Sequence, residues 1–490
     1  MNRLSILAVS IALATSPAAA GVDLYSLTPS AHAFQAATPP GGVPIAGFTP
    51  YALLGLTDAT QNQLDWDAMG QPNWTGSAYP EPANPYFTAA LFDTGANVCL
   101  LGHDDRTAYG LGATDYTFDV TGAGPDVVTA DILEPAGWFV VGMQHEGALP
   151  DTSAFVGISN AESLGAQSTA ADLPTVVGTP MAVYYSTVIR TDRIRHGATG
   201  DGAPIRTPEL SFYASRYDPE IPPFDYRLET SFYDPGGVET LPPTFIPDLM
   251  PDILPPAPTV ASAIQVEVEL VHDAGSGDRV GGGQFLFDTG AQVTVISRDQ
   301  GMVLGLDESS PDFTVEITGI GGTVEEAPGF YLDHLTLPAQ GVGDYVLEDV
   351  PIVMLNVPSD EAPVTGIVGM NCFSERDVTV HGGFHNGVKG TPFVDISAAH
   401  IRGDLNADGA LNGLDIPDFK SALADSLAWQ SAHPDIDLDF YGDFNRDGAF
   451  NGLDIPGFKE GLQGTSVPEP ATAVLTALAL TGLVARRRRR

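Results

Sequence analysis

The sequence has little of three things: cysteine, basic residues and helical periodicity. Only two cysteines occur among 490 residues, Cys99 and Cys372, and they could form one disulfide or remain buried free thiols. No cluster of cysteine and histidine and no His-Glu-x-x-His motif is present, so zinc peptidase chemistry is unsupported. Lysine and arginine together number 21 against 62 acidic residues, a net charge of −41. This balance argues against nucleic acid as a partner, because phosphate binding needs basic patches.

The two ends of the chain have the patterns of targeting segments. Residues 1–20 carry an early arginine, an apolar stretch and small residues before Gly21, which predicts a secretory signal peptide. Near the other end, Val467-Pro468-Glu469-Pro470 precedes an apolar stretch, 471–485, and five arginines. This tail, 467–490, resembles the PEP-CTERM sorting signal of bacteria, which implies a transmembrane helix and an exosortase-like processing enzyme. A plain tail anchor is the alternative, and both place the protein outside the cytoplasm, at the cell surface or beyond it.

Most of the chain is predicted to be mainly β. Residues 264–270 alternate apolar and polar side chains, which is typical of a strand with one face in water. Residues 21–85 are rich in proline, alanine and aromatic residues without a period, and we interpret them as an irregular lead-in followed by the first strands. Seven prolines within 241–258 prevent a regular β-ladder and indicate a linker. We therefore expect a first lobe over 40–235, a linker over 236–261 and a second lobe over 262–400.

The tripeptide Asp-Thr-Gly occurs twice, at 93–95 and at 288–290, each time after an apolar run and before alanine. The copies are 195 residues apart (288 − 93 = 195). A carboxylate at the end of a buried strand is costly unless it is hydrogen-bonded or used in chemistry. Two such turns brought together would let Asp93 and Asp288 share one proton and activate a water between them.

The residues around the second copy resemble the pepsin/retropepsin superfamily of aspartic proteases. The segment Gly319-Ile320-Gly321-Gly322 is similar to the flap tip of retroviral proteases, and 366–371 resembles the segment that threads behind the catalytic turn. The first copy follows the same order, with 121–124 as a candidate flap and Val176-Val177-Gly178 as the threading segment. The resemblance implies two β-barrel lobes in one chain, as in pepsins. One working lobe beside a decayed one is the alternative.

The resemblance also implies a role for each residue of the two turns. One carboxylate would act as general base on a water and the other would donate a proton to the scissile carbonyl, and neither role is assigned because the pair titrates as a unit. Thr94 and Thr289 would form hydrogen bonds across to the opposite turn. Gly95 and Gly290 would let the turns approach closely. Unlike pepsins, both copies carry alanine after the tripeptide, and no clear flap tyrosine lies near 121–124.

From residue 403 the chain changes to a repeated acidic loop. The twelve residues 404–415 recur at 443–454, 39 residues later, with glycine at the sixth position and an apolar helix start after each loop. Oxygen side chains at this spacing are typical of calcium loops. The pair resembles a dockerin, which implies a small all-α module over 403–463, structural calcium and a cohesin-like partner, with a calcium-stabilised spacer as the alternative. The implied ligands are Asp404, Asn406, Asp408, Ala410, Asn412 and Asp415 in the first loop and Asp443, Asn445, Asp447, Ala449, Asn451 and Asp454 in the second.

Two functions of different classes follow from these patterns. The first is an exported, cell-surface aspartic endopeptidase that needs no cofactor for catalysis and acts on peptides or proteins. The second is a catalytically inactive surface binding or structural protein that keeps the protease fold. A polysaccharide enzyme would rest on the dockerin resemblance alone, since glycosidase carboxylates carry no Asp-Thr-Gly-Ala signature. Both copies of the signature favour the peptidase.

Overall fold

The computed structural model forms two compact units, 1–399 and 400–490, which are described separately. The predicted linker up to residue 260 and the tail from 467 lie outside the described residues, and of the predicted signal peptide only two short strands are described. No helix in the described part of the chain is long and apolar enough to cross a membrane. The structure describes residues 6–7, 11–12, 43–58, 80–81, 84–85, 87–122, 124, 126–143, 156–168, 173–198, 204–232, 261–273, 277–356, 364–382, 384–385, 388–389, 391–434, 436–445 and 449–464.

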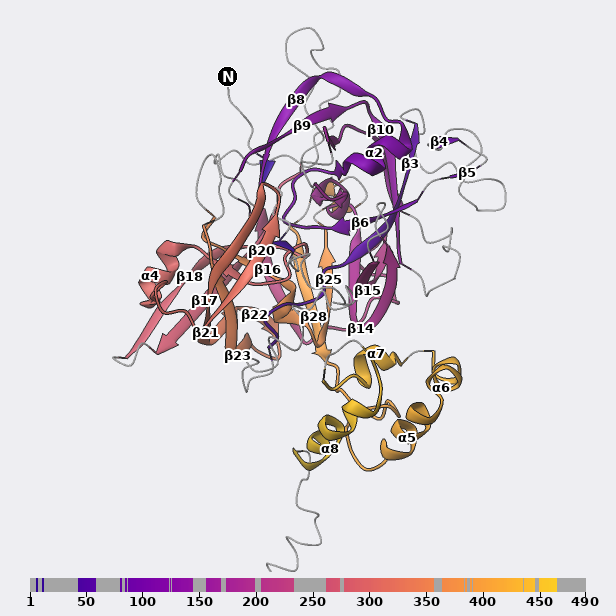
Figure 1. The fold of residues 1–490 in the computed structure, drawn as a ribbon, viewed down its shortest axis with the longest axis vertical. Helices are drawn as coiled ribbons and strands as arrows, with labels where there is room; N and C mark the ends of the chain where they lie inside the picture. Colours follow the sequence, from indigo (N-terminus) through magenta and orange to yellow (C-terminus); the bar gives the residue numbers. More distant parts are fainter. Residues whose placement is uncertain are drawn as a thin grey trace, which may run out of the picture. The chain divides into compact units, whose positions relative to one another are not determined.

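The first lobe is built on a ten-stranded sheet with the order β1-β8-β9-β12-β7-β13-β6-β3-β10-β11 (Figure 1). Most pairs are antiparallel, and the threading strand β13 pairs in parallel with β6. A separate two-stranded ribbon is formed by β4 and β5. The elements are β1 (Ile6–Leu7), β3 (Tyr51–Asp58), β4 (Pro80–Glu81), β5 (Asn84–Pro85), β6 (Thr88–Phe92), β7 (Leu100–Leu101), α2 (His103–Tyr109), β8 (Ala113–Thr121), β9 (Val128–Leu133), β10 (Ala136–Gly142), β11 (Val156–Ala161), β12 (Leu164–Ala166), β13 (Val176–Val177) and α3 (Thr179–Ala182).

The second lobe belongs to a fourteen-stranded sheet in which β17 pairs with both β18 and β21, so that part of the sheet closes into a barrel. The expected strand at 264–270 is β17, whose side chains alternate between buried and exposed positions. The mainly β class predicted from the sequence is confirmed. The elements are β2 (Ile11–Ala12), β14 (Ser186–Ala198), β15 (Pro204–Tyr213), β16 (Tyr226–Phe232), β17 (Ile264–Asp273), β18 (Asp278–Phe287), β19 (Val295–Ile296), α4 (Arg298–Leu304), β20 (Phe313–Gly319), β21 (Gly322–Leu337), β22 (Ala339–Gly341), β23 (Tyr345–Met354), β24 (Gly366–Val368), η4 (Met370–Phe373), β25 (Arg376–His381), β26 (Phe384–His385), β27 (Val388–Lys389) and β28 (Phe393–Ala399).

The two lobes repeat one plan with a constant offset. Helix α2 begins at His103 and α4 begins at Arg298, 195 residues later (298 − 103 = 195). Both helices end at a glycine in the left-handed region, Gly110 with φ 67° and Gly305 with φ 74°, a conformation that glycine adopts without strain. The short strands β7 and β19 keep the same offset. The order of elements around the two Asp-Thr-Gly turns is therefore duplicated within one unit.

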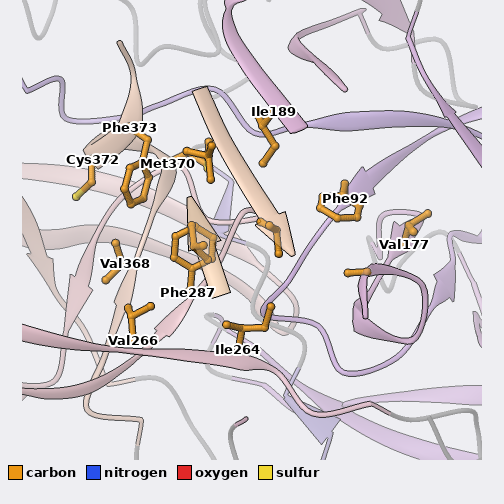
Figure 2. Close-up of a cluster of buried hydrophobic side chains, with 14 of the residues drawn as sticks. Phe92, Val177, Ile189, Ile264, Val266, Phe287, Val368, Met370, Cys372 and Phe373 are labelled. Carbon is orange, nitrogen blue, oxygen red and sulfur yellow. The ribbon is translucent and has the colours of Figure 1, made fainter. Parts of the chain in front are cut away.

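A single apolar cluster runs through both lobes and includes Phe92 and Phe287, the residues directly before the two turns (Figure 2). Phe92 and Phe287, the last strand residues before each turn, are almost completely buried in it. The Phe92 ring meets Phe212 edge-on at 5.7 Å, and the Phe287 ring packs against Phe373 at 5.6 Å. Burying an aromatic side chain of this size contributes about 2 kcal/mol. The strand ends that carry the aspartates are thus fixed by the shared core.

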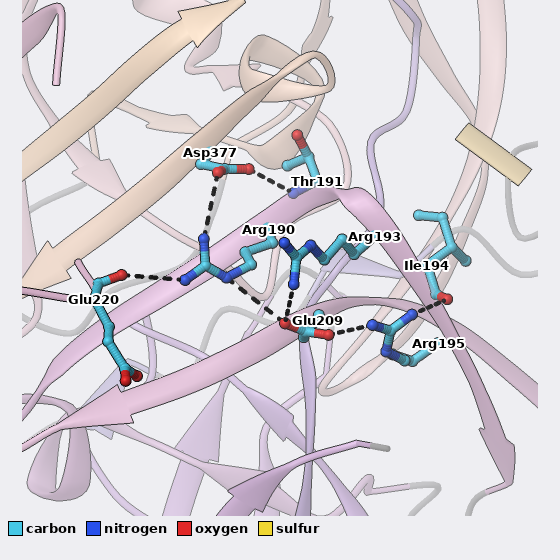
Figure 3. Close-up of polar contacts among 8 residues, drawn as sticks. All are labelled: Arg190, Thr191, Arg193, Ile194, Arg195, Glu209, Glu220 and Asp377. Carbon is cyan, nitrogen blue, oxygen red and sulfur yellow. Dashed lines mark hydrogen bonds and ion pairs between the residues drawn. The ribbon is translucent and has the colours of Figure 1, made fainter. Parts of the chain in front are cut away.

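The sheet that joins the lobes gathers several of the few arginines in the chain. Strand β14 has an irregular register between Arg190 and Ile194, and three guanidinium groups converge on Glu209 of β15 (Figure 3). Arg190 Nε and Arg193 Nη1 lie 3.6 and 3.5 Å from Glu209 Oε1, and Arg195 is paired with the other oxygen. Arg190 also reaches Asp377 of β25 at 3.9 Å. These ion pairs hold β14 to its neighbours on both sides.

A second polar network crosses the same sheet. Arg227 of β16 donates to both oxygens of Asp395 at 2.6 and 2.7 Å, and His381 Nε2 lies 3.2 Å from Asp395 Oδ2. The other ring nitrogen of His381 is 2.9 Å from the hydroxyl of Ser186 on β14. Burial raises the pKa of Asp395, but the hydrogen bonds from Arg227 and His381 outweigh it, so the pKa of this carboxyl is lowered. The pair therefore persists in mild acid.

Replacing Arg227 with methionine should expose the importance of this pair. We expect a loss of about 2 kcal/mol at neutral pH, below the 3–5 kcal/mol typical of a fully buried pair, because one third of the Arg227 side chain is exposed. A lowered pKa gives stability that is present above the unfolded carboxyl pKa and is lost as pH falls through the native value. Without Arg227 the native pKa of Asp395 rises toward its unfolded value, so urea unfolding between pH 3 and 7 should show a smaller loss of stability in acid for Arg227→Met than for the wild type. Arg298→Met, which removes an exposed pair with Glu308, is the control and should change stability by less than about 0.5 kcal/mol.

The C-terminal unit is helical and repeats the duplication of its loops. Phe419 and Phe458, 39 residues apart (458 − 419 = 39), stack with ring centroids 3.9 Å apart at an angle of 9°. Leu405 and Trp429 complete the buried centre. The elements are α5 (Ile416–Ala424), α6 (Ser426–Ala432), α7 (Leu438–Tyr441), η5 (Gly452–Asp454) and α8 (Ile455–Gly464).

Candidate active site

Each aspartate stands at the end of a strand that is paired on its far side by a threading strand. The amide of Asp93 donates to Val177 O at 3.0 Å, and the amide of Asp288 donates to Val368 O at 3.1 Å. The threading strands β13 and β24 run parallel to the strands that carry the aspartates. Both segments therefore lie where their sequence pattern predicts, directly behind the turns.

The turns hold the two carboxylates in the same way. In the first turn, the amides of Gly95 and Ala96 donate to Asp93 Oδ1 at 2.8 and 3.0 Å. In the second, the amides two and three residues after Asp288 donate to its Oδ1 at 2.8 and 3.1 Å. Both aspartates are almost fully buried, with exposed fractions of 0% and 1%. The backbone thus fixes Oδ1 of each carboxylate in the same way.

The threonines of the two turns tie the lobes together. Thr94 Oγ1 donates to Phe287 O at 2.6 Å and accepts from the amide of Thr289 at 3.1 Å. Thr289 Oγ1 reciprocates, donating to Phe92 O at 2.7 Å and accepting from the amide of Thr94 at 3.1 Å. All four bonds are buried and cross between the lobes. The structure therefore places both threonines in the geometry that the resemblance implied.

The two carboxylates face each other across the glycines of the opposite turn. A Cβ on Gly95 would lie 2.5 Å from Asp288 Cγ, and a Cβ on Gly290 would lie 2.5 Å from Asp93 Cγ. Neither glycine can therefore carry a side chain without displacing the partner aspartate. Burial, and then the negative charge of Asp93 and a hydrogen bond with its carboxyl, hold the pKa of Asp288 well above its usual range. This environment disfavours ionisation of both carboxyls at once.

The second oxygen of Asp288 is the one available to a reactant. Oδ2 is buried, and no backbone amide or hydroxyl of the described residues donates to it. Leaving a buried carboxylate oxygen unpartnered is costly. Sharing a proton with Asp93 and binding a water would both offset that cost, and both are requirements of general acid–base hydrolysis.

The structure forms two β-hairpins at the positions of the candidate flaps, one in each lobe, and hydrogen bonds join their tips. Strands β8 and β9 make the first hairpin and β20 and β21 make the second. The amide of Gly124 donates to Ile320 O at 2.9 Å, and the amide of Asp126 donates to Gly321 O at 3.0 Å. Ile320 is 1% exposed and packs into an apolar cluster of the first lobe that includes Leu91. Gly124 of the candidate first flap and the nearby Asp126 therefore lie against Ile320 and Gly321 of the candidate second flap.

Neither cysteine forms a disulfide, so this alternative is excluded. Cys99 and Cys372 are buried free thiols. Burial raises the pKa of each thiol to about 12, although hydrogen bonds with Gly178 and Thr294, respectively, act in the opposite direction. Thiols with so high a pKa are poor nucleophiles.

Sequence reasoning missed the contacts that each turn receives from the opposite lobe. The amide of Gly47 donates to Gln292 O at 2.8 Å, and the amide of Ala261 donates to Asn97 O at 2.9 Å. Gln292 and Asn97 occupy matching positions of the repeat (292 − 97 = 195). The repeat indicates that a hydrogen bond received by one turn has a counterpart at the other. It does not identify the donor residues, because the segments that supply them share no motif.

Part of the chain matches a known protein family. Residues 276–372 match the model of a protein family described as "Aspartyl protease", and this segment contains Asp288, the flap tip at 319–322 and β24. The second lobe therefore carries an aspartyl protease domain, and the enzyme is an aspartic-type peptidase. No curated protein matches the chain. Among solved structures, an aspartic proteinase from Irpex lacteus is similar, with 12% identity and a TM-score of 0.36 over 72% of this chain and 98% of that one.

Removing the hydroxyl of Thr94 should loosen the join between the lobes. Thr94→Val leaves Phe287 O and the amide of Thr289 buried without their partner, which should cost about 3 kcal/mol. Thr94→Ser keeps the hydroxyl and is the matched control. Urea unfolding at a fixed pH would measure the difference, and equal stability of the valine and serine variants would contradict the role given to these bonds.

Proposed function

We propose that this protein is an exported, cell-surface aspartic endopeptidase in which Asp93 and Asp288 form one dyad. The observation that carries the proposal is the reciprocal contact of the two turns, in which each aspartate lies against the glycine of the other lobe. A second lobe working alone would need a second copy of the chain to complete the pair. Here the first lobe supplies the matching turn, threading strand and flap.

The geometry supports hydrolysis by a shared proton. With one carboxyl protonated, the ionised partner removes a proton from a water held between them, and the protonated one donates to the carbonyl oxygen of the scissile peptide bond. The raised pKa of Asp288 favours this singly protonated state over a doubly ionised one. The two flaps would cover the peptide and exclude bulk water during the reaction.

The proposal is favoured over an inactive scaffold because the costly features of the site are intact. Two buried carboxylates in contact destabilise the fold, and a protein that only used the scaffold for binding would gain by replacing one of them. Location at the cell surface rests on the sequence of the two ends, 1–20 and 467–490. The substrates would be peptides or unfolded proteins, since the closed flaps admit an extended chain only after they open.

We also propose that the C-terminal unit binds calcium through its two acidic loops. In the first loop, Gly409 has φ 84°, and its amide and that of Asp408 donate to the carboxylate of Asp404 at 2.8 and 3.0 Å. Asp404 and Asp415 are buried, and burial followed by the charge of Asp404 raises the pKa of Asp415. Buried carboxylates at this spacing suit a hard cation with oxygen ligands, which would neutralise their charge.

The second loop repeats the arrangement where it is described. The backbone amides of Asn445 and Asn451 donate to the carboxylate of Asp454 at 3.2 and 2.8 Å. The backbone amides of the equivalent residues in the first loop donate to Asp415 in the same way. Asp443 and Asp454 are buried. Asp447 lies outside the described residues. The proposed ligands remain the two sets of six residues named from the sequence, and the bound ions would have a structural role, in a spacer or in a module for a cohesin-like partner.

The dyad is tested by two nearly isosteric substitutions. Asp288→Asn and Asp93→Asn should each reduce cleavage of acid-denatured globin by more than about 10³-fold, because either change removes the shared proton. Activity of the wild type should be highest in acid and fall as pH rises through the second ionisation of the pair. Mass spectrometry of the globin fragments would measure the cleavage rate at each pH. Retained activity in Asp93→Asn alone would point to a dimer of second lobes.

The Asp288→Asn variant also tests how this buried carboxyl affects stability. The raised pKa of Asp288 means that the native state binds more protons than the unfolded state above the ordinary carboxyl pKa, so stability should fall as pH rises through this window. Asp288→Asn should flatten that part of the profile and be more stable than the wild type at neutral pH. A steeper profile in the variant would contradict the burial of an ionisable pair.

Calcium binding is tested on the full chain by calorimetry. Addition of calcium to chelator-treated protein should release heat from two sites, and Asp415→Ala with Asp454→Ala should abolish it, because these residues are the most buried carboxylates of the loops. Asp418→Ala, an acidic residue in the first turn of α5 outside the loop, is the control and should bind as the wild type does. No heat in the wild type would mean that the loops are acidic turns only.

A further inference from the structure

A short segment near the start of the first lobe contacts both Asp-Thr-Gly turns. Residues 43–50, here named the strap, run from the second turn to the first and are buried at six of eight positions. We propose that the strap is a positioning element of the dyad, which sets how the two aspartates face each other. This inference rests on the proposed pairing of Asp93 with Asp288 and goes beyond it.

One end of the strap is fixed to the second turn. The amide of Gly47 donates to the carbonyl of Gln292, four residues after Asp288, at 2.8 Å. A Cβ on Gly47 would lie 2.3 Å from the carbonyl carbon of Met370 and 2.5 Å from the amide nitrogen of Asn371. The amide of Met370 in turn donates to Ala291 O at 2.8 Å. Gly47 thus packs backbone against backbone on the segment that supports the Asp288 turn.

The other end of the strap is fixed to the first turn. The carbonyl of Pro50 accepts from the amide of Phe92, the residue before Asp93, at 2.9 Å. Thr207 Oγ1 holds this end in place, accepting from the amide of Tyr51 at 2.7 Å and donating to Thr49 O at 3.2 Å. The bond to the second turn and the bond to the first are only three positions apart in the chain (50 − 47 = 3). So short a link transmits any displacement of one turn to the other.

Side chains of the strap add apolar contacts on the second lobe. Ile45 and Ala46 are 5% and 2% exposed and pack in a cluster with Leu286 and Ala291, which flank Asp288. Residues of the first chain segment therefore complete the packing under the second turn. The Asp288 turn does not have its native support without them.

The first turn is also contacted by the residue ahead of the second lobe, and the strap and this contact are here called the two clasps. Ala261, just ahead of the second lobe, donates its amide to Asn97 O at 2.9 Å and accepts from Thr179 Oγ1 at 3.0 Å. The strap reaches both turns, whereas these two hydrogen bonds of Ala261 reach the first turn and the residue that follows its threading segment. Because proton sharing depends on the separation of the carboxyls, and an error of about 1 Å in a reacting group can cost 10²-fold in rate, these clasps bear directly on catalysis.

The first test substitutes Gly47 with alanine in the full chain. The new methyl group must push the strap away from residues 370–371, so kcat on acid-denatured globin should fall by about 10-fold or more with little change in KM. The pH–rate profile should also move, because altered contact between the carboxyls changes their coupled titration. A variant that merely folded less well would lose amplitude and keep the wild-type profile.

The second test removes the anchor of the strap without touching the turns. Thr207→Val takes away the hydroxyl that holds Thr49 and Tyr51 and should shift the pH–rate profile in the same direction as Gly47→Ala. Thr207→Ser retains the hydroxyl and should restore the wild-type profile and kcat. Circular dichroism would verify that each variant is folded at the assay temperature.

A readout independent of activity separates this inference from the proposed function. The difference in stability between each protein and its Asp288→Asn version, followed against pH by urea unfolding, reports the titration of Asp288. In Gly47→Ala and Thr207→Val the midpoint of that difference should move, whether or not globin is cleaved. An unchanged midpoint and pH–rate profile in both variants would overturn the strap as a positioning element. A shifted midpoint in the two variants, together with a wild type that does not cleave globin, would leave the strap standing and refute the peptidase.

Discussion

The four hydrogen bonds between Thr94 and Thr289 and the opposite turns are the constraint on which the rest of this structure depends. They join two backbone segments that each carry a buried carboxylate, at a place where the carboxylates alone would drive the lobes apart. Each hydroxyl both donates and accepts, so the two hydroxyls, two amides and two carbonyls of these four bonds are all paired. The glycines that follow make the approach sterically possible, and the shared aromatic core beneath makes it rigid. The dyad is therefore a property of the interface between lobes.

The duplication is strict near the dyad and loose away from it. The offset of 195 holds from Asp93 to Gly110, through the turn, the short strand and the helix. It then changes, since the threading glycines Gly178 and Gly369 are 191 residues apart (369 − 178 = 191). Each of these glycines lies against carbonyl oxygens of its own turn, where a Cβ would come within 2.3 Å. Close packing of backbone on backbone explains why the pattern survives here, because no other residue fits.

This difference explains how far the sequence alone could lead. The aspartates, the threonines and the threading segments were predictable because they belong to a motif that occurs twice in the chain and resembles that of a known family. The strap was not predictable. Gly47 stands in a stretch rich in glycine and proline that has no period, and its contact with Gln292 spans 245 residues (292 − 47 = 245). The joined flap tips were missed for the same reason, since backbone bonds between distant loops leave no trace in side-chain chemistry.

The flaps show how one lobe can control access to a site that both lobes build. Opening them exchanges two backbone hydrogen bonds for bonds to water, at about 1 kcal/mol each, and exposes Ile320, at about 2 kcal/mol. A total of about 4 kcal/mol corresponds to roughly one open molecule in a thousand. The two flaps contribute differently to the closed state. The second lobe provides the buried Ile320 side chain, and the first lobe provides the apolar cluster into which it packs. A peptide that binds beneath the flaps must then supply contacts that replace those made by Ile320, so that binding and closure draw on the same apolar surface.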